Sequence, residues 1–140
     1  MSAGNAIPLK IRSDAPAGPA SGLAMALGHE ILAHLDQLLA SGEPGALDLK
    51  SMPMSPADYR ALRSLLGEGE IDLTLELDGP TRIRETAFPG VWWIQHRDAA
   101  GTILAENIEI NRVPQFLQTP GDAVEQSADL LRSRLKGEAE

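Results

Sequence analysis

Residues 70–78 read Glu-Ile-Asp-Leu-Thr-Leu-Glu-Leu-Asp, and this regular alternation of polar and apolar residues decides the fold class. Successive side chains of a β-strand point to opposite faces of the sheet, so a period of two is typical of a half-buried strand. The apolar residues expected to face the core are Ile71, Leu73, Leu75 and Leu77. The other face is acidic, and we predict a strand with one core face and one charged face.

The residues that follow this strand predict how it pairs. A two-residue turn would place Arg82 opposite Leu75, on the apolar face. A three-residue loop over residues 78–80 instead pairs Leu75 with Ile83, and this is the register that we expect. It leaves three acidic residues without a basic neighbour on the pairing strand: Glu68, Glu70 and Asp72.

Three more strands are predicted, over residues 46–50, 91–97 and 102–113. Phe88-Pro89-Gly90-Val91 fits a type II turn before the second of them, because Pro presets φ and Gly accepts the positive φ of the next position. The alternation of the last strand is interrupted near Ala105, which predicts a β-bulge.

Apolar spacings of three and four residues and capping residues predict three helices. The first begins after Ser21 or Gly22, the second is capped by Ser55 and ends at Gly67, and the third covers residues 120–136. The third helix is expected to turn these residues inward: Val124, Ala128, Leu131 and Leu135. We therefore predict an α+β fold, an antiparallel meander of about four strands with helices packed on one face, over residues 22–140 and preceded by a flexible tail over residues 1–21.

Composition excludes several classes of function. The 140 residues carry a formal charge of −8, which disfavours nucleic acid as a partner because phosphate binding needs clustered cations. The chain has no Cys, so it forms no disulfide, thiolate nucleophile or Cys-ligated metal site. No stretch approaches the roughly 20 apolar residues of a membrane span. Residues 1–21 lack the apolar run of a secretory signal, and we expect a cytoplasmic protein without membrane insertion.

Candidate catalytic and metal-binding motifs are weak. His29 and His34 are five residues apart, whereas two metal ligands on one helix face need a spacing of four. Gly67-Glu68-Gly69-Glu70 ends a helix and carries carboxylates, unlike a phosphate loop. We therefore expect no enzyme, cofactor or metal. Two alternatives stay open: a small carboxylate-dependent hydrolase or metal enzyme, if Glu68, Glu70, Asp72 or Glu85 converge in a cleft, and a homodimeric assembly module.

The aromatic residues are concentrated in one segment. Trp92 and Trp93 are adjacent in a predicted strand, so one must be core while the other faces solvent, a helix or a partner. Phe88 lies just before them. An exposed aromatic side chain beside an acidic strand would form a peptide-binding surface.

Two stretches resemble the signatures of a known family. These are Leu65-Leu66-Gly67-Glu68-Gly69-Glu70-Ile71 and Glu85-Thr86-Ala87-Phe88-Pro89-Gly90-Val91-Trp92, and they resemble the C-terminal conserved region of the HupH/HyaF hydrogenase expression family. The resemblance implies an accessory protein of nickel–iron hydrogenase maturation that is not an enzyme. It implies a chaperone for the small-subunit precursor with its twin-arginine signal, working alongside a thioredoxin-like partner of the HupG/HyaE type.

The residues and the resemblance together give a hypothesis about the binding surface. A twin-arginine signal presents two cations and an apolar stretch, which are complementary to acids beside aromatic side chains. The candidate partner-binding residues are Glu68, Glu70, Asp72, Glu85, Phe88, Trp92 and Trp93.

Overall fold

The computed structural model describes residues 21–137, so the predicted tail lies outside the described residues except for Ser21. The helices in chain order are α1 (Leu23–Ser41), α2 (Pro56–Leu66) and α3 (Gly121–Leu135), with two short 3-10 helices, η2 (Leu49–Ser51) and η3 (Gln115–Leu117). The strands are β1 (Gly45–Asp48), β2 (Asp72–Leu77), β3 (Gly79–Glu85), β4 (Val91–Arg97) and β5 (Ile103–Ile110). No helix within residues 21–137 is both long enough and apolar enough to cross a membrane.

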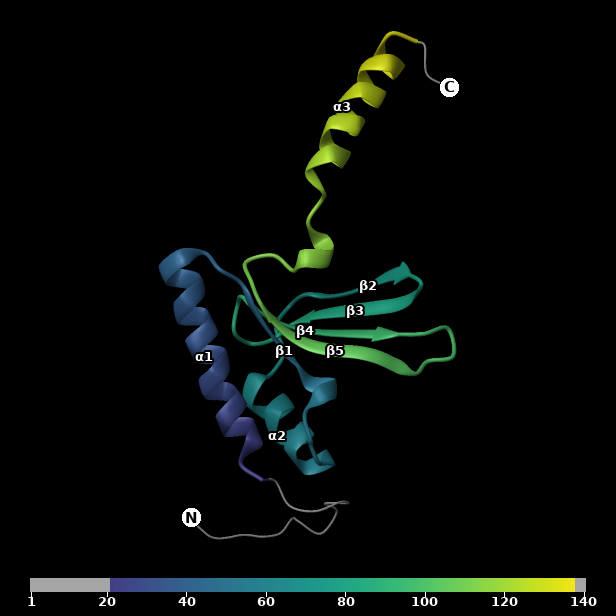
Figure 1. The fold of residues 1–140 in the computed structure, drawn as a ribbon. Helices are drawn as coiled ribbons and strands as arrows, with labels where there is room; N and C mark the ends of the chain where they lie inside the picture. Colours follow the sequence, from purple (N-terminus) through teal and green to yellow (C-terminus); the bar gives the residue numbers. More distant parts are fainter. Residues whose placement is uncertain (1–20, 138–140) are drawn as a thin grey trace.

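The strands form one antiparallel sheet with the order β1-β5-β4-β3-β2 (Figure 1). The meander of β2 to β5 confirms the predicted arrangement, and the short first strand adds a fifth at the β5 edge. The fold is therefore α+β, as predicted. Two of the described helices, α1 and α2, pack together and cover one face of the sheet.

The main core lies between these helices and the sheet. α1 contributes Leu27, Ile31 and Leu38, whose spacing of four and seven residues places them on one stripe of the helix. α2 contributes Leu62 and Leu66. The sheet contributes a set of side chains from its central and edge strands: Leu47, Val91, Trp93, Ile108 and Ile110. Leu39 and Leu65 belong to the apolar spacing pattern of these two helices, but both are exposed.

The opposite face of the sheet holds a smaller apolar cluster. Ile83, Trp92 and Ile94 are buried there, and Leu73 and Leu75 from β2 pack against them with Leu117 of η3. The two tryptophans therefore lie on opposite faces, as their adjacency predicts. Both faces of β4 are covered, which is why its first five residues are all buried.

The register of β2 and β3 differs from the prediction by two residues. Ile83 pairs with Leu73 instead of Leu75, and Leu77 pairs with Gly79. β3 starts immediately after Asp78, so no three-residue loop forms. In this register Gly79 has a φ of 105° and approaches β4 closely: an added Cβ would lie 2.2 Å from the carbonyl oxygen of Arg97, so the position requires glycine. A shift of two residues preserves the faces of a strand, and Leu73 and Leu75 pack in an apolar cluster as predicted. Ile71 was also expected to face the core, but it lies before β2 and is exposed, so this part of the prediction is wrong.

Predictions from local sequence signals were more accurate than the predicted register. Ser55 and Asp58 form the predicted helix start as a reciprocal capping box, with Pro56 at the first helical position. The turn before β4 is closed by a hydrogen bond from the Val91 N–H to the Phe88 carbonyl at 2.9 Å. The predicted bulge is present.

That bulge lies where the end of β4 pairs with the start of β5. His96 pairs with Ala105 and the next residue, Arg97, pairs with Ile103, so Leu104 is the extra residue on β5. The bulge restores the alternation beyond Ala105, which places Glu106, Ile108 and Ile110 on the same face of the sheet.

The prediction for α3 is wrong in one respect. The helix forms, but it projects away from the sheet (Figure 1) and none of its residues is buried. Leu131, which was expected to face inward, is 59% exposed, and Val124 and Leu135 are exposed as well. An apolar stripe at helical spacing indicates a face that can pack, but it does not say whether this chain supplies the surface to pack against.

We expect Leu131→Ala in α3 to change the free energy of unfolding by less than about 0.5 kcal/mol, because exposed positions away from packed features usually have such small effects. Urea unfolding of both proteins measures the difference. A loss of about 2 kcal/mol or more, the usual minimum for truncating a buried leucine, would show that α3 is packed in solution.

Candidate functional site

The loop between α2 and β2 is held firmly against the β3–β4 turn. The Gly69 N–H donates to the carbonyl of Glu85 at 2.8 Å, and the Glu85 N–H donates to the carbonyl of Ile71 at 2.8 Å. A Cβ at Gly69 would lie 2.4 Å from the carbonyl oxygen of Thr86, so the close approach requires glycine. The loop is thus fixed in place, and it presents Glu68 and Glu70 at the surface.

Asp72 is not the unpaired acid that the predicted register suggested. Its carboxylate forms a bidentate ion pair with Arg82, with nitrogen–oxygen distances of 3.0 and 2.7 Å. Hydrogen bonding to Arg82, together with its charge, holds the pKa of Asp72 below its usual value. The prediction that Asp72 lacks a basic neighbour is wrong, because the actual register puts Arg82 within reach.

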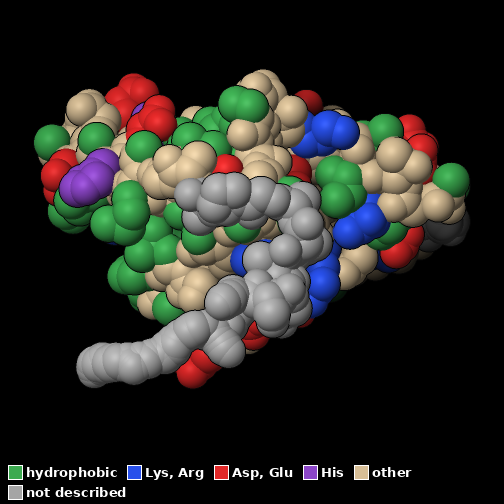
Figure 2. All heavy atoms as spheres, turned by 90° about the horizontal axis from the view of Figure 1, so that it is seen from below, with side chains coloured by type: hydrophobic (Ala, Val, Ile, Leu, Met, Phe, Trp, Pro, Cys, Tyr) green, Lys and Arg blue, Asp and Glu red, His purple; other side chains and the backbone are tan. Residues whose placement is uncertain are grey.

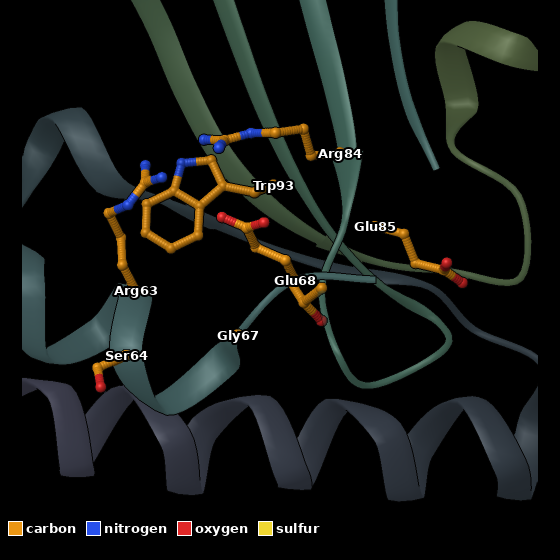
Figure 3. Close-up of a pocket in the computed structure, with 8 residues that line it drawn as sticks. Arg63, Ser64, Gly67, Glu68, Arg84, Glu85 and Trp93 are labelled. Carbon is orange, nitrogen blue, oxygen red and sulfur yellow. The ribbon is translucent and has the colours of Figure 1, made fainter. Parts of the chain in front are cut away.

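The other three predicted acids occupy different environments. Glu68 is exposed and points toward Trp93, whereas Glu85 points away from it (Figure 3). Glu85 is half-buried and its carboxylate accepts a hydrogen bond from the Glu70 N–H at 3.3 Å. Neither Glu68 nor Glu70 forms an ion pair within residues 21–137.

The tryptophans do not supply an exposed anchor. Trp93 lies beneath α2 and its indole N–H donates to Glu106 at 2.7 Å. Trp92, on the opposite face, donates to the carbonyl of Asn111 at 3.0 Å. Both rings are buried, so the aromatic side chain of this segment that reaches the surface is Phe88, which is 47% exposed.

Phe88 borders an apolar groove of about 270 Å³ between α1, α2 and the β3–β4 turn. Its lining includes three other exposed apolar side chains: Met25, Leu32 and Leu65. Figure 2 shows hydrophobic side chains gathered over the part of the surface that α1 forms. The groove explains why Leu65 is exposed although it belongs to the apolar stripe of α2, and it adjoins the loop that carries Glu68.

A second, polar pocket of about 290 Å³ lies on the other side of the same loop. Arg63 of α2, Arg84 of β3 and Trp93 of β4 line it together with Glu68 (Figure 3). The Arg63 guanidinium carbon lies 5.5 Å from the centroid of the Trp93 ring. This pocket was not predicted from the sequence because its residues come from three separate elements.

A buried carboxylate beneath α2 was also missed. Glu106 is 5% exposed and accepts hydrogen bonds from Trp93 and from Gln95, the latter at 2.8 Å, and from the hydroxyl of Tyr59. Burial raises its pKa to about 7, and the charge of Lys50 opposes this shift. The alternation with Ile108 and Ile110 is the sequence signal that places Glu106 on the core face.

The acids do not form a paired-carboxylate site. Glu68, Asp72 and Glu85 line a small pocket of about 60 Å³, but Arg82 and Arg84 line it too, and Arg82 neutralises Asp72. Among residues 21–137 no group of three or more His, Asp or Glu side chains could hold a metal ion. What the arrangement offers chemically is recognition of apolar and charged groups.

The fold is a small α+β domain with an apolar groove and a polar pocket on either side of one loop. The chain belongs to the family of HupH hydrogenase expression proteins, because the profile of the C-terminal conserved region of that family matches residues 23–137. The solved structure of the hydrogenase expression protein HupH from Thiobacillus denitrificans is similar, with a TM-score of 0.76 and 42% identity, over 84% of this chain and 98% of that one.

Curated relatives agree with this membership. The chain is 33% identical over 99 residues to the hydrogenase expression/formation protein HoxQ of Azotobacter vinelandii, which covers 71% of this chain and 34% of HoxQ. It is 31% identical over 105 residues to the hydrogenase-1 operon protein HyaF of Escherichia coli, covering 74% of this chain and 36% of HyaF. The resemblance noted in the sequence is confirmed, and the chain spans about a third of the length of these relatives.

Proposed function

We propose that this protein is an accessory factor of nickel–iron hydrogenase maturation that binds the hydrogenase small-subunit precursor before export, without catalysing a reaction. Relatives named as hydrogenase expression or formation proteins support the process. The observation that supports binding is the apolar groove at Phe88 beside the acidic loop that carries Glu68 and Glu70.

The groove and the loop match the two parts of a twin-arginine signal. An apolar segment of the signal lies in the groove, where it covers Leu32, Leu65 and Phe88 and gains contact energy from their burial. The adjacent arginines face Glu68 and Glu70, which steer the positively charged segment toward the groove. Asp72 has no part in this step because its carboxylate is already paired with Arg82.

We expect the double variant Glu68→Lys/Glu70→Lys to bind a small-subunit signal peptide more weakly, with a smaller dependence on salt, because exposed charges act mainly on association and are screened by ions. Leu32→Asp is expected to weaken binding at every salt concentration, since it places a charge in the groove. Titration of a labelled signal peptide at low and high salt measures both effects.

A matched control reverses two acids far from the loop, Asp122→Lys/Glu125→Lys in α3, with the same change in net charge. This variant should keep the affinity and most of the salt dependence of the wild-type protein. If the loop variant and the α3 variant behave alike, the acids of the loop have no specific role; if Leu32→Asp binds normally, the peptide does not use the groove.

A further inference from the structure

The polar pocket contains two arginines whose charges are not neutralised by a contact. Within residues 21–137, neither Arg63 nor Arg84 forms an ion pair, and no hydrogen bond from either guanidinium group is found. The neighbouring Arg82 differs from them because Asp72 holds it in a bidentate pair. Two neighbouring arginines without an ion pair are unexpected in a chain with a formal charge of −8, where acidic residues outnumber basic ones.

The two guanidinium groups destabilise one another. Arg84 is half-buried, and its pKa is lowered by burial first and then by the charges of Arg63 and Arg82. The charges of Asp72 and Glu68 oppose this shift without neutralising Arg84. An anion placed between Arg63 and Arg84 would remove the repulsion and satisfy their donors.

Figure 3 shows what already approaches this position. The guanidinium groups of Arg63 and Arg84 both point toward the indole of Trp93, and the carboxylate of Glu68 points toward the same space from the loop. Glu68 is exposed and makes no ion pair, so it lies near the two arginines without binding them. The chain thus presents its own carboxylate at the mouth of this pocket.

We propose that the pocket lined by Arg63, Arg84 and Trp93 binds a carboxylate group of a peptide, in competition with the chain's own Glu68. The planar, forked donors of arginine match a carboxylate in bidentate geometry, and Trp93 forms an apolar wall beside it. Glu68 and Glu85 at the rim disfavour a doubly charged phosphate more than a singly charged carboxylate. This site is separate from the apolar groove and carries the opposite charge preference from the acidic loop.

The two tryptophans make the binding directly observable. The chain has only two, and Trp93 lines the pocket whereas Trp92 lies on the other face of the sheet. Nitrogen-15 spectra of the full chain therefore contain a reporter indole and an internal control. The probe is the blocked peptide acetyl-Gly-Glu-Gly-amide. It is compared with three other ligands: its Gln counterpart, acetyl-Gly-Ala with a free or an amidated terminus, and inorganic phosphate.

The Glu peptide is expected to shift the Trp93 indole signal in a saturable way and to leave Trp92 unmoved, while the Gln peptide shifts neither. Arg63→Gln and Arg84→Gln are each expected to weaken binding by about tenfold or more, because each removes charge-assisted hydrogen bonds. Arg60→Gln, on the same helix and exposed, should bind like the wild-type protein. Binding of acetyl-Gly-Ala only with a free terminus would assign the ligand to a main-chain terminus, and binding only of the Glu peptide to a side chain.

The direction in which Glu68→Gln changes peptide affinity distinguishes the two proposals. It removes the internal competitor and is expected to strengthen binding of the Glu peptide several-fold. The proposed function instead requires the same change to weaken binding of the signal peptide. The two proposals can therefore fail separately. The carboxylate site would be overturned by no shift with any carboxylate probe, by equal non-zero shifts with the Glu and Gln peptides, by unchanged affinity in the folded arginine variants, or by tighter binding of phosphate than of carboxylate. Weaker binding of the Glu peptide by Glu68→Gln would overturn the role of Glu68.

Discussion

Replacing Glu106 with Gln is expected to raise the free energy of unfolding above that of the wild-type protein at about pH 8, and to do so much less at about pH 5. Glu106 is buried under α2, and burial raises its pKa from 4.5 to about 7. The neutral carboxyl is therefore the form that the folded protein accommodates better. Gln has the same shape and no charge to bury.

The sign follows from proton linkage. A carboxyl whose pKa is higher in the folded state contributes stability below its unfolded value, near 4.5, and loses that contribution as the pH rises through about 7. A shift from 4.5 to about 7, at about 1.4 kcal/mol for each pH unit, corresponds to roughly 3 kcal/mol by pH 8. The hydrogen bonds that Trp93 and Gln95 donate to the ionised carboxylate act in the opposite direction and reduce this figure.

Chemical unfolding at several pH values measures the effect as the difference between Glu106→Gln and the wild-type protein, so that the titration of all other groups cancels. Glu125→Gln, an exposed glutamate on α3, is the matched control and should track the wild-type protein across the whole range. A constant difference between Glu106→Gln and the wild type from about pH 5 to pH 8 would mean that burial does not raise the pKa of Glu106.

The elements of this fold were readable from the sequence because their signals are local. The capping residues Ser55 and Asp58 fix the start of α2, and the turn at Pro89 fixes the start of β4. The pairing of β2 with β3 was not readable, since the observed register goes with a close approach between Gly79 and Arg97, eighteen positions further along the chain. The position of α3 was not readable either, because an apolar stripe does not identify its partner.

For the candidate site too, local features could be predicted from the sequence and contacts between distant elements could not. The loop acids Glu68 and Glu70 could be named as candidates because they belong to one alternating pattern, and Phe88 because it lies in a local turn; all three are exposed in the structure. The pocket of Arg63, Arg84 and Trp93 depends on three elements meeting in space, which spacing along the chain does not reveal. The burial of both tryptophans could not be predicted without knowing that each face of β4 is covered.

Replacing Gly79 with Ala is expected to destabilise the protein by about 3 kcal/mol. Two separate costs add at this position. The backbone has a φ of 105°, which costs an L-residue roughly 1–2 kcal/mol. The new methyl group would also lie 2.2 Å from the carbonyl oxygen of Arg97, and backbone cannot rotate away as a side chain can. Relief of this clash requires the β2–β3 hairpin to separate from the end of β4.

Gly101→Ala separates the two costs. Gly101 also lies in a hairpin turn and has a φ of 92°, but no atom lies within 4 Å of its added Cβ. This control variant should therefore lose only the conformational cost of about 1–2 kcal/mol. Urea unfolding of both variants under identical conditions gives the difference, which we expect to be at least about 1 kcal/mol. If Gly79→Ala is no less stable than Gly101→Ala, close contact with Arg97 does not set the register of β2 and β3, and the sheet reaches that register for another reason.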